Sequence, residues 1–204
     1  MDAALRQISD QLDDATQPLL GSARVLSEAD LRAPSLLPGW SRAHVLAHLA
    51  RNADGLRNLL IGARAGQTRE AYPSAQARED DIERGSRHGS TELAEDIAAS
   101  AMAFRAVARQ LDAAAWQFGV HMLDGVDFPA AQVLTRRLVE VELHHGDLGT
   151  GYGPADWPAA FAALDLPEPL HSLRQDRLSR AAGNGSAADG ASVDEAGGAQ
   201  PSQA

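Results

Sequence analysis

The sequence predicts an all-α protein, an up-and-down bundle of four or five helices. Three observations lead to this prediction. Apolar residues recur at intervals of three and four residues over several long segments. No stretch alternates apolar and polar residues for long enough to build a sheet. The chain has 204 residues and is 44% hydrophobic, which is enough for one sizeable core.

The first two long helices are placed by their apolar stripes and end signals. Leucines and an isoleucine recur at mostly helical spacing between Asp2 and about Leu26, with Pro18 as a position where this helix can bend or split. A loop with two prolines and a glycine follows. Ser41, a good N-cap, then begins a second helix that runs to about Ala63.

Two more long helices are expected in the second half of the chain. One begins at Ser90 and carries an apolar stripe that includes Ile97 and Phe104. The other follows Pro129, a residue favoured in the first turn of a helix. Shorter helices are predicted at residues 75–84 and near residues 157–164.

Composition divides the chain into three parts. Residues 1–155 carry the long helices of the bundle, and residues 156–180 form a short C-terminal extension. Residues 181–204 are rich in Gly, Ala and Ser and contain a single large aliphatic residue, Val193. Such a segment buries too little apolar surface to offset the entropy of ordering, so it is predicted to be a disordered tail.

Charge and composition argue against several classes of function. The 28 acidic and 18 basic residues give a net charge of −10, which disfavours nucleic acid as a partner. Without cysteine the chain has no thiolate of its own, so any sulfur chemistry must import a thiol. The N-terminus does not look like a signal peptide, and no apolar run reaches the ~18 residues of a membrane span. A cytoplasmic location is therefore expected, while oligomeric state leaves no signal in the sequence.

The segment EVELHH, residues 140–145, carries the strongest chemical pattern. Glu140 and His144 are four residues apart, so on a helix they lie side by side and form a half-site for a divalent metal. An exposed ion pair is the ordinary alternative for this spacing. Asp147 lies three residues further and can accept a hydrogen bond from a ligand imidazole, although a solvated Asp at a helix end is equally compatible.

The second helix supplies candidates for a third ligand. His44 and His48 are also four residues apart, and facing helices of a bundle bring distant ligands together. Spacing alone does not choose between them, and His145 points about 100° away from its neighbour His144. Two imidazoles and one carboxylate leave a coordination position open, as in catalytic zinc sites, and the same set also suits iron(II).

Other conspicuous residues have ordinary structural explanations. The remaining histidines, His88, His121 and His171, have no partner at ligand spacing and are expected at the surface. Trp40 and Trp116 are expected to pack in or against the core. The glycines after residue 145 follow a helix instead of a strand, which favours a helix end and turn over a phosphate loop.

Two longer motifs carry a resemblance to a known family. Residues 31–60, LRAPSLLPGWSRAHVLAHLARNADGLRNLL, and residues 126–152, VDFPAAQVLTRRLVEVELHHGDLGTGY, strongly resemble the N-terminal domain of mycothiol-dependent maleylpyruvate isomerases, within the DinB-like metalloenzyme superfamily. The resemblance covers most of residues 1–155. It implies a DinB-like four-helix bundle, a divalent metal usually taken as zinc, and mycothiol as thiol cofactor. Carried across the motifs, the implied metal ligands are His48, Glu140 and His144.

The reaction that the resemblance implies is the cis–trans isomerisation of maleylpyruvate to fumarylpyruvate in aromatic catabolism. The mycothiol sulfur adds to the double bond, the adduct rotates about the new single bond, and elimination follows. Full-length isomerases also carry a small α/β domain with a basic substrate-side residue, and the segment after residue 155 is too short to form it. That basic residue is then either missing or supplied by a nearer arginine, such as Arg51 or Arg137.

Two alternatives remain open for the function. One is a mycothiol S-transferase that conjugates the thiol to a small electrophile without rotation and elimination. The other is a noncatalytic helical domain that binds a metal or a partner.

Overall fold

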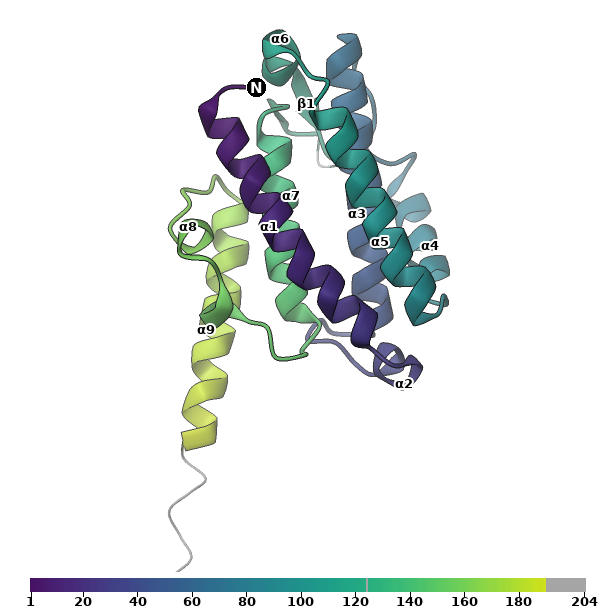
Figure 1. Ribbon diagram of the computed structural model, residues 1–204, viewed down its shortest axis with the longest axis vertical. Helices are drawn as coiled ribbons and strands as arrows, with labels where there is room; N and C mark the ends of the chain where they lie inside the picture. The colour runs from purple at the N-terminus through teal and green to yellow at the C-terminus, as the bar shows by residue number, and fades with distance from the viewer. Residues whose placement is uncertain (124, 190–204) are drawn as a thin grey trace, which may run out of the picture. The chain divides into compact units, whose positions relative to one another are not determined.

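A computed structural model describes residues 1–123 and 125–189 and confirms the all-α fold (Figure 1). The described chain divides into two compact units, residues 1–165 and a second unit that begins at Leu166. In the first unit α1 and α3 each pack against both α5 and α7, so the four helices enclose one core. Their bounds are α1 (Ala3–Val25), α3 (Arg42–Ala65), α5 (Ser90–Ala108) and α7 (Gln132–Asp147).

Short elements complete the first unit. The sequence predicts α4 and a longer α8, but not the β1–β2 hairpin, because strands of three residues are too short to show alternation. Pro18 lies inside α1, which continues through it as one helix. The short elements are α2 (Glu28–Arg32), α4 (Ala75–Gly85), α6 (Ala113–Gln117), β1 (Gly119–His121), β2 (Asp127–Pro129), the 3-10 helix η1 (Pro154–Asp156) and α8 (Ala159–Ala162).

The second unit contains a helix that the sequence analysis does not anticipate. This helix, α9 (Leu170–Asp189), begins in the predicted C-terminal extension and continues into the segment predicted to be disordered. Residues 190–204 of that segment lie outside the described residues. None of the helices within residues 1–123 and 125–189 has the length and apolar character needed to cross a membrane.

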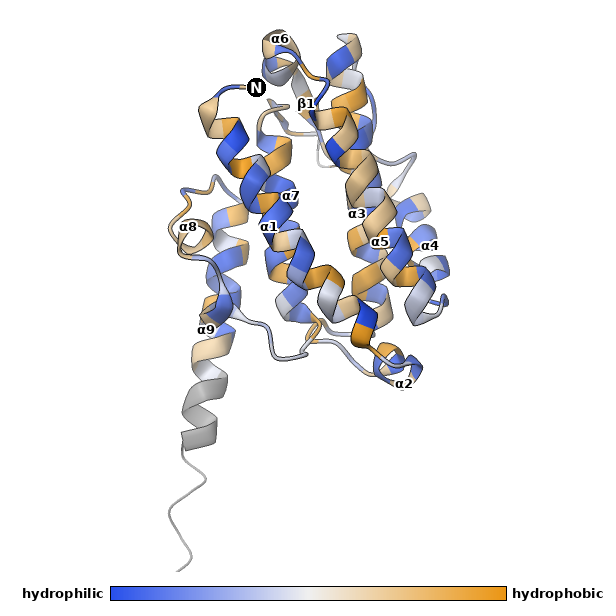
Figure 2. Cartoon of the chain, viewed as in Figure 1, coloured by the Kyte–Doolittle hydropathy of each residue, from blue (hydrophilic) through white to orange (hydrophobic). Residues whose placement is uncertain are grey.

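The central helix of the bundle is α3. Val45, Leu46 and Leu49 have no exposed surface, and most other α3 residues are buried as well. A helix that is buried all round needs neighbours on every side, and α5, α7 and α4 provide them. Figure 2 shows apolar and polar residues interleaved along the long helices, as expected for a bundle with one shared core. Polar side chains on α3 are therefore held inside the protein.

The start of α7 differs from the prediction. The sequence predicts Pro129 in the first turn of this helix, but the structure places it at the end of β2, and the helix begins at Gln132. The reason is a competing hydrogen bond, because the amide of Ala130 donates to the carbonyl of Phe118 at 2.9 Å. That contact closes the hairpin before the helix starts.

The start of α3 is joined to the end of α7. The Arg42 side chain donates from Nε to the carbonyl of Leu148 at 2.8 Å. The amide of Leu36 donates to the carbonyl of Asp147, also at 2.8 Å. Carbonyls in the last turn of a helix lack intrahelical partners and favour positive charge nearby. These contacts satisfy them and fix how α3 and α7 are aligned.

Two glycines test this packing. A Cβ added at Gly62 of α3 would lie 2.6 Å from the backbone oxygen of Gln67, whereas a Cβ at Gly21 of α1 would have nothing within 4 Å. We expect Gly62→Ala to lower the free energy of unfolding by about 1–3 kcal/mol. Gly21→Ala is expected to raise it by about 0.5–1 kcal/mol, because alanine is the better helix former. Urea denaturation measures both, and equal effects would contradict the assigned packing.

Candidate metal centre

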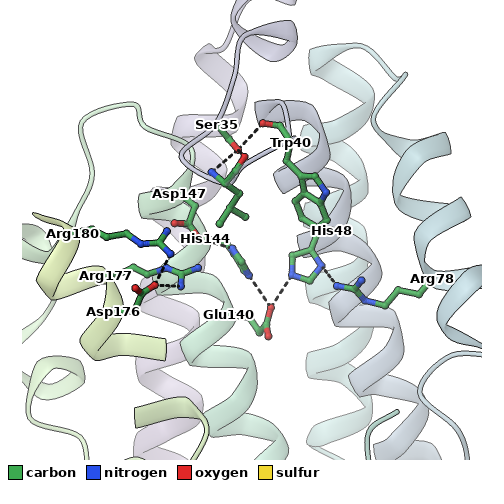
Figure 3. A network of polar contacts seen from close by, with 11 residues as sticks. Ser35, Trp40, His48, Arg78, Glu140, His144, Asp147, Asp176, Arg177 and Arg180 are labelled. Atoms are coloured by element: carbon green, nitrogen blue, oxygen red, sulfur yellow. Dashed lines mark hydrogen bonds and ion pairs between the residues drawn. The ribbon is translucent and has the colours of Figure 1, made fainter. Parts of the chain in front are cut away.

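Three side chains from two helices converge near one point in the bundle. His48 comes from α3, and Glu140 and His144 come from α7. Each offers one donor atom, and the three atoms lie within 4.8 Å of one another. Figure 3 shows both imidazoles pointing toward the same carboxylate. His48 is buried, and the other two are partly exposed.

The distances within this cluster suit a shared divalent ion. Nε2 of His48 lies 2.9 Å from Oε2 of Glu140, and Nε2 of His144 lies 3.3 Å from the same oxygen. Zinc holds its ligand atoms at about 2.0–2.2 Å, which in tetrahedral geometry places neighbouring ligand atoms about 3.4 Å apart. The two imidazole rings meet edge to face, with centroids 4.6 Å apart. The donor set and its spacing therefore fit a metal with two imidazoles and one carboxylate.

Local sequence explains why these side chains meet. The i, i+4 spacing on α7 places Glu140 and His144 on one face, and the apolar residues Leu138 and Val141 are buried beside them. On α3, His48 lies between Ala47 and Leu49, both essentially unexposed. An imidazole at this position cannot reach water freely, so it requires a polar partner inside the protein.

Asp147 holds His144 in place from the other side of its ring. Its Oδ2 lies 2.9 Å from Nδ1 of His144, so Nδ1 donates to Asp147 and Nε2 faces Glu140. Burial alone would lower the pKa of His144, but the hydrogen bonds to Asp147 and Glu140 outweigh burial and raise the pKa to about 9. This is the outer partner that the sequence spacing suggested.

His48 has a different outer partner, Arg78 from α4. Nη2 of Arg78 lies 3.1 Å from Nδ1 of His48. A guanidinium only donates, so Nδ1 accepts and Nε2 carries the hydrogen that His48 donates to Glu140. Burial lowers the pKa of His48 despite the hydrogen bond to Glu140. The half-buried Trp40 ring lies against the same imidazole, with centroids 5.5 Å apart.

The carboxylate of Glu140 is ionised in these surroundings. Burial by itself would raise its pKa, but hydrogen bonds from His144 and His48 hold the pKa well below its usual value. The cluster thus contains one anion, and both imidazoles contact it.

The neighbouring histidines and Glu142 serve other contacts. His44 is the third residue of α3 and bonds to the N-cap Ser41, while its Nε2 lies 3.1 Å from Glu83. His145 bonds to Ser22 at 2.8 Å and stacks on Tyr152, whose hydroxyl donates to Glu142. Neither His44 nor His145 belongs to the cluster. Helical spacing already pointed His145 away from His144, whereas His44 is excluded by its contacts at the start of α3.

The arginine that contacts an imidazole of the cluster is not one that the sequence analysis named. Arg51 pairs with Asp54 and Asp96. Arg137 is near enough to interact with the charge of Glu140, but it is buried and its Nη1 donates to groups on α3. Arg78 instead lies at the cluster, and it comes from a short charged helix with only one fully buried residue, Ile82. Nothing in the spacing of that segment distinguishes Arg78 from its charged neighbours.

Comparison with known proteins points to one family. The family described as "Mycothiol maleylpyruvate isomerase N-terminal domain" matches residues 12–149. Two solved structures are similar, one of the mycothiol-dependent maleylpyruvate isomerase and one of its histidine-to-alanine mutant. Each is 29% identical with a TM-score of 0.73, and each alignment covers 77% of this chain and 65% of the other. The chain thus spans less than two thirds of the length of these proteins. No curated protein matches it.

The protonation of His144 generates a prediction for the metal-free protein. We expect a pKa of about 9 for His144 and of about 4 for His145. Asp147→Asn should lower the pKa of His144, because it removes the charge that Nδ1 contacts. Because the folded-state pKa of His144 exceeds the unfolded value of about 6.5, its protonation stabilises the fold fully below pH 6.5, and this contribution is lost as the pH rises through about 9. Histidine NMR titration after treatment with a chelator measures these pKa values. A His144 pKa near 6.5 would disprove the assigned contacts.

Proposed function

Because this chain belongs to the mycothiol maleylpyruvate isomerase N-terminal domain family, we propose that it binds a divalent metal through His48, Glu140 and His144 and uses it in thiol-dependent chemistry. The observation that supports this most strongly is the convergence of three donor atoms from α3 and α7 within 4.8 Å. The donor set suits zinc and also iron(II). The chemistry that such a cation supplies when bound is to lower the pKa of a nearby thiol.

The residues around the cluster prepare it for this role. Asp147 holds the His144 ring so that Nε2 faces the shared oxygen of Glu140. Coordination of a metal through Nε2 of His48 would require Nδ1 to carry the hydrogen of the neutral ring. Nδ1 could then no longer accept a hydrogen bond from Arg78. Arg78 would then lose this partner and keep its ion pair with Glu79. A guanidinium beside His48 suits a substrate carboxylate.

We infer that the reaction is the isomerisation of maleylpyruvate with mycothiol. The thiolate sulfur forms a bond to one alkene carbon, and the electron pair of the double bond moves toward the adjacent carbonyl. Rotation about the resulting single bond precedes elimination, in which the C–S bond breaks, the double bond re-forms as trans, and the thiolate leaves. Arg78 binds a carboxylate during rotation, and Trp40 shields the His48 side of the site from water.

Metal content tests the ligand assignment. We expect His48→Ala and Glu140→Ala to lose stoichiometric zinc after dialysis, because each removes one of three ligands, while the helical content persists. His44→Ala is the matched control, since it lies one turn earlier on α3 and should keep its zinc. Elemental analysis and far-ultraviolet circular dichroism measure the two properties. Full zinc occupancy in both ligand variants would rule out the assignment.

Turnover tests the reaction. The zinc-loaded chain with mycothiol should convert maleylpyruvate to fumarylpyruvate, with no conversion when the thiol is omitted. Arg78→Gln should raise KM by about tenfold without loss of zinc, because it removes one charge-assisted contact. The reaction is monitored by the change in absorbance as one isomer is converted to the other. An accumulating thioether would indicate an S-transferase instead, and absence of thiol-dependent turnover would indicate a noncatalytic domain.

A further inference from the structure

Tyr72 is a buried aromatic residue in the loop between α3 and α4. Its surface is 8% exposed, and that of the preceding Ala71 is 2% exposed. The side-chain amide of Asn58 donates to the carbonyl of Ala71 at 3.2 Å, which ties this part of the loop to α3. The Tyr72 ring packs against α3 at Gly55, where an added Cβ would lie 2.6 Å from Cζ of the ring. Glycine at this position therefore leaves the space that the ring occupies.

The Tyr72 ring contacts the arginine beside the metal cluster. Cζ of Arg78 lies over this ring, 5.9 Å from its centroid. A guanidinium within about 6 Å of an aromatic centroid is attracted by the negative face of the ring. Burial raises the pKa of Tyr72, and the charges of Arg78 and Glu140 shift it in opposite directions, so the phenol is near enough to interact with both groups. Tyr72 thus connects the loop before α4 to the cluster.

Three contacts hold the Arg78 guanidinium. It donates to Nδ1 of His48 at 3.1 Å, so that His48 lies between Arg78 and Glu140 (Figure 3). It forms an ion pair with Glu79, whose side chain is 55% exposed, and it lies over the Tyr72 ring. An exposed ion pair between neighbours on one helix holds a side chain only weakly. If a metal binds Nε2 of His48, the contact with that imidazole is lost. The Tyr72 ring is then the buried contact that remains.

We propose that Tyr72 is a positioning residue, which keeps the guanidinium of Arg78 beside His48 and thereby sets the affinity for the substrate carboxylate. This inference rests on the proposed function, in which Arg78 binds that carboxylate. The aromatic face carries the effect, because the guanidinium lies over the ring. Gly55 has a supporting role, since it allows the ring to pack on α3 at this depth.

Steady-state kinetics of the zinc-loaded chain with mycothiol tests this role. Tyr72→Leu removes the ring and should raise KM for maleylpyruvate about fivefold, while kcat changes no more than about twofold. Tyr72→Phe keeps the aromatic face and should stay within about twofold of the wild type in both parameters. An unchanged KM in Tyr72→Leu, or an equal rise of KM in Tyr72→Phe, would overturn the proposal.

A double-mutant cycle shows whether Tyr72 acts through Arg78. In an Arg78→Gln background, Tyr72→Leu should raise KM no more than about twofold further, because the guanidinium is already absent. Glu79→Gln removes the exposed ion pair and should change KM no more than about twofold. Effects of Tyr72→Leu and Arg78→Gln that multiply, or a rise of KM in Glu79→Gln as large as that in Tyr72→Leu, would contradict the assigned role.

Nuclear magnetic resonance of the zinc-loaded variants reports on Arg78 without turnover. An aromatic ring shifts the resonances of protons above its face, so Tyr72→Leu should move the Nε–Hε signal of Arg78. The same signal of Arg84, which pairs with Asp81 on α4, is the control and should not move. An Arg78 signal that does not respond would refute the positioning role.

Two further results separate the possible failures. Circular dichroism and zinc content show whether Tyr72→Leu is folded and loaded, and Tyr72→Met, with its more adaptable side chain, replaces it if it is not. If the wild-type chain shows no thiol-dependent turnover, the proposed function fails. The Arg78 signal then decides by itself whether Tyr72 positions the guanidinium.

Discussion

The pairing of the partly buried Glu140 carboxylate with two imidazoles is the interaction on which the rest of the structure depends. A carboxylate that loses part of its hydration is unfavourable unless charged or hydrogen-bonding partners replace it. His48 from α3 and His144 from α7 supply these partners at 2.9 and 3.3 Å. That arrangement requires the two helices to pack in one register. The remaining long helices, α1 and α5, complete the core that maintains it.

The two imidazoles meet the same oxygen but differ in protonation. Asp147 accepts a hydrogen bond from His144 and raises the pKa of that ring, whereas burial lowers the pKa of His48, which accepts a hydrogen bond from Arg78. Opposite pKa shifts in adjacent groups are typical of sites that move protons or bind ions. The contacts outside the three-residue cluster, together with burial, therefore determine which ring must lose a proton if the proposed ion binds.

The ease of predicting each site residue depended on how locally its position is determined. Glu140 and His144 could be predicted from their spacing, because one turn of α7 aligns them. The choice of His48 over His44 required the family resemblance, and the structure gives its reason: His44 is the third residue of α3 and turns back to the N-cap Ser41. Arg78 could not be predicted from the sequence, because only the packing of α4 on α3 brings it to the cluster.

The same reasoning applies to the fold. The long helices follow from apolar periodicity, which a local stretch of sequence already contains. The late start of α7 does not, because it depends on a hydrogen bond between Ala130 and Phe118 across the hairpin. Contacts between distant segments leave no periodic signature.

The joint between the start of α3 and the end of α7 bears on how this protein tolerates changes in chain length. His48 and Glu140 are separated by 92 positions along the chain, yet the Arg42–Leu148 contact aligns their helices directly. The path of the chain between the two helices is therefore not the only thing that sets their alignment. A change of length in a surface loop along that path leaves the Arg42–Leu148 contact in place to hold the two helix ends together.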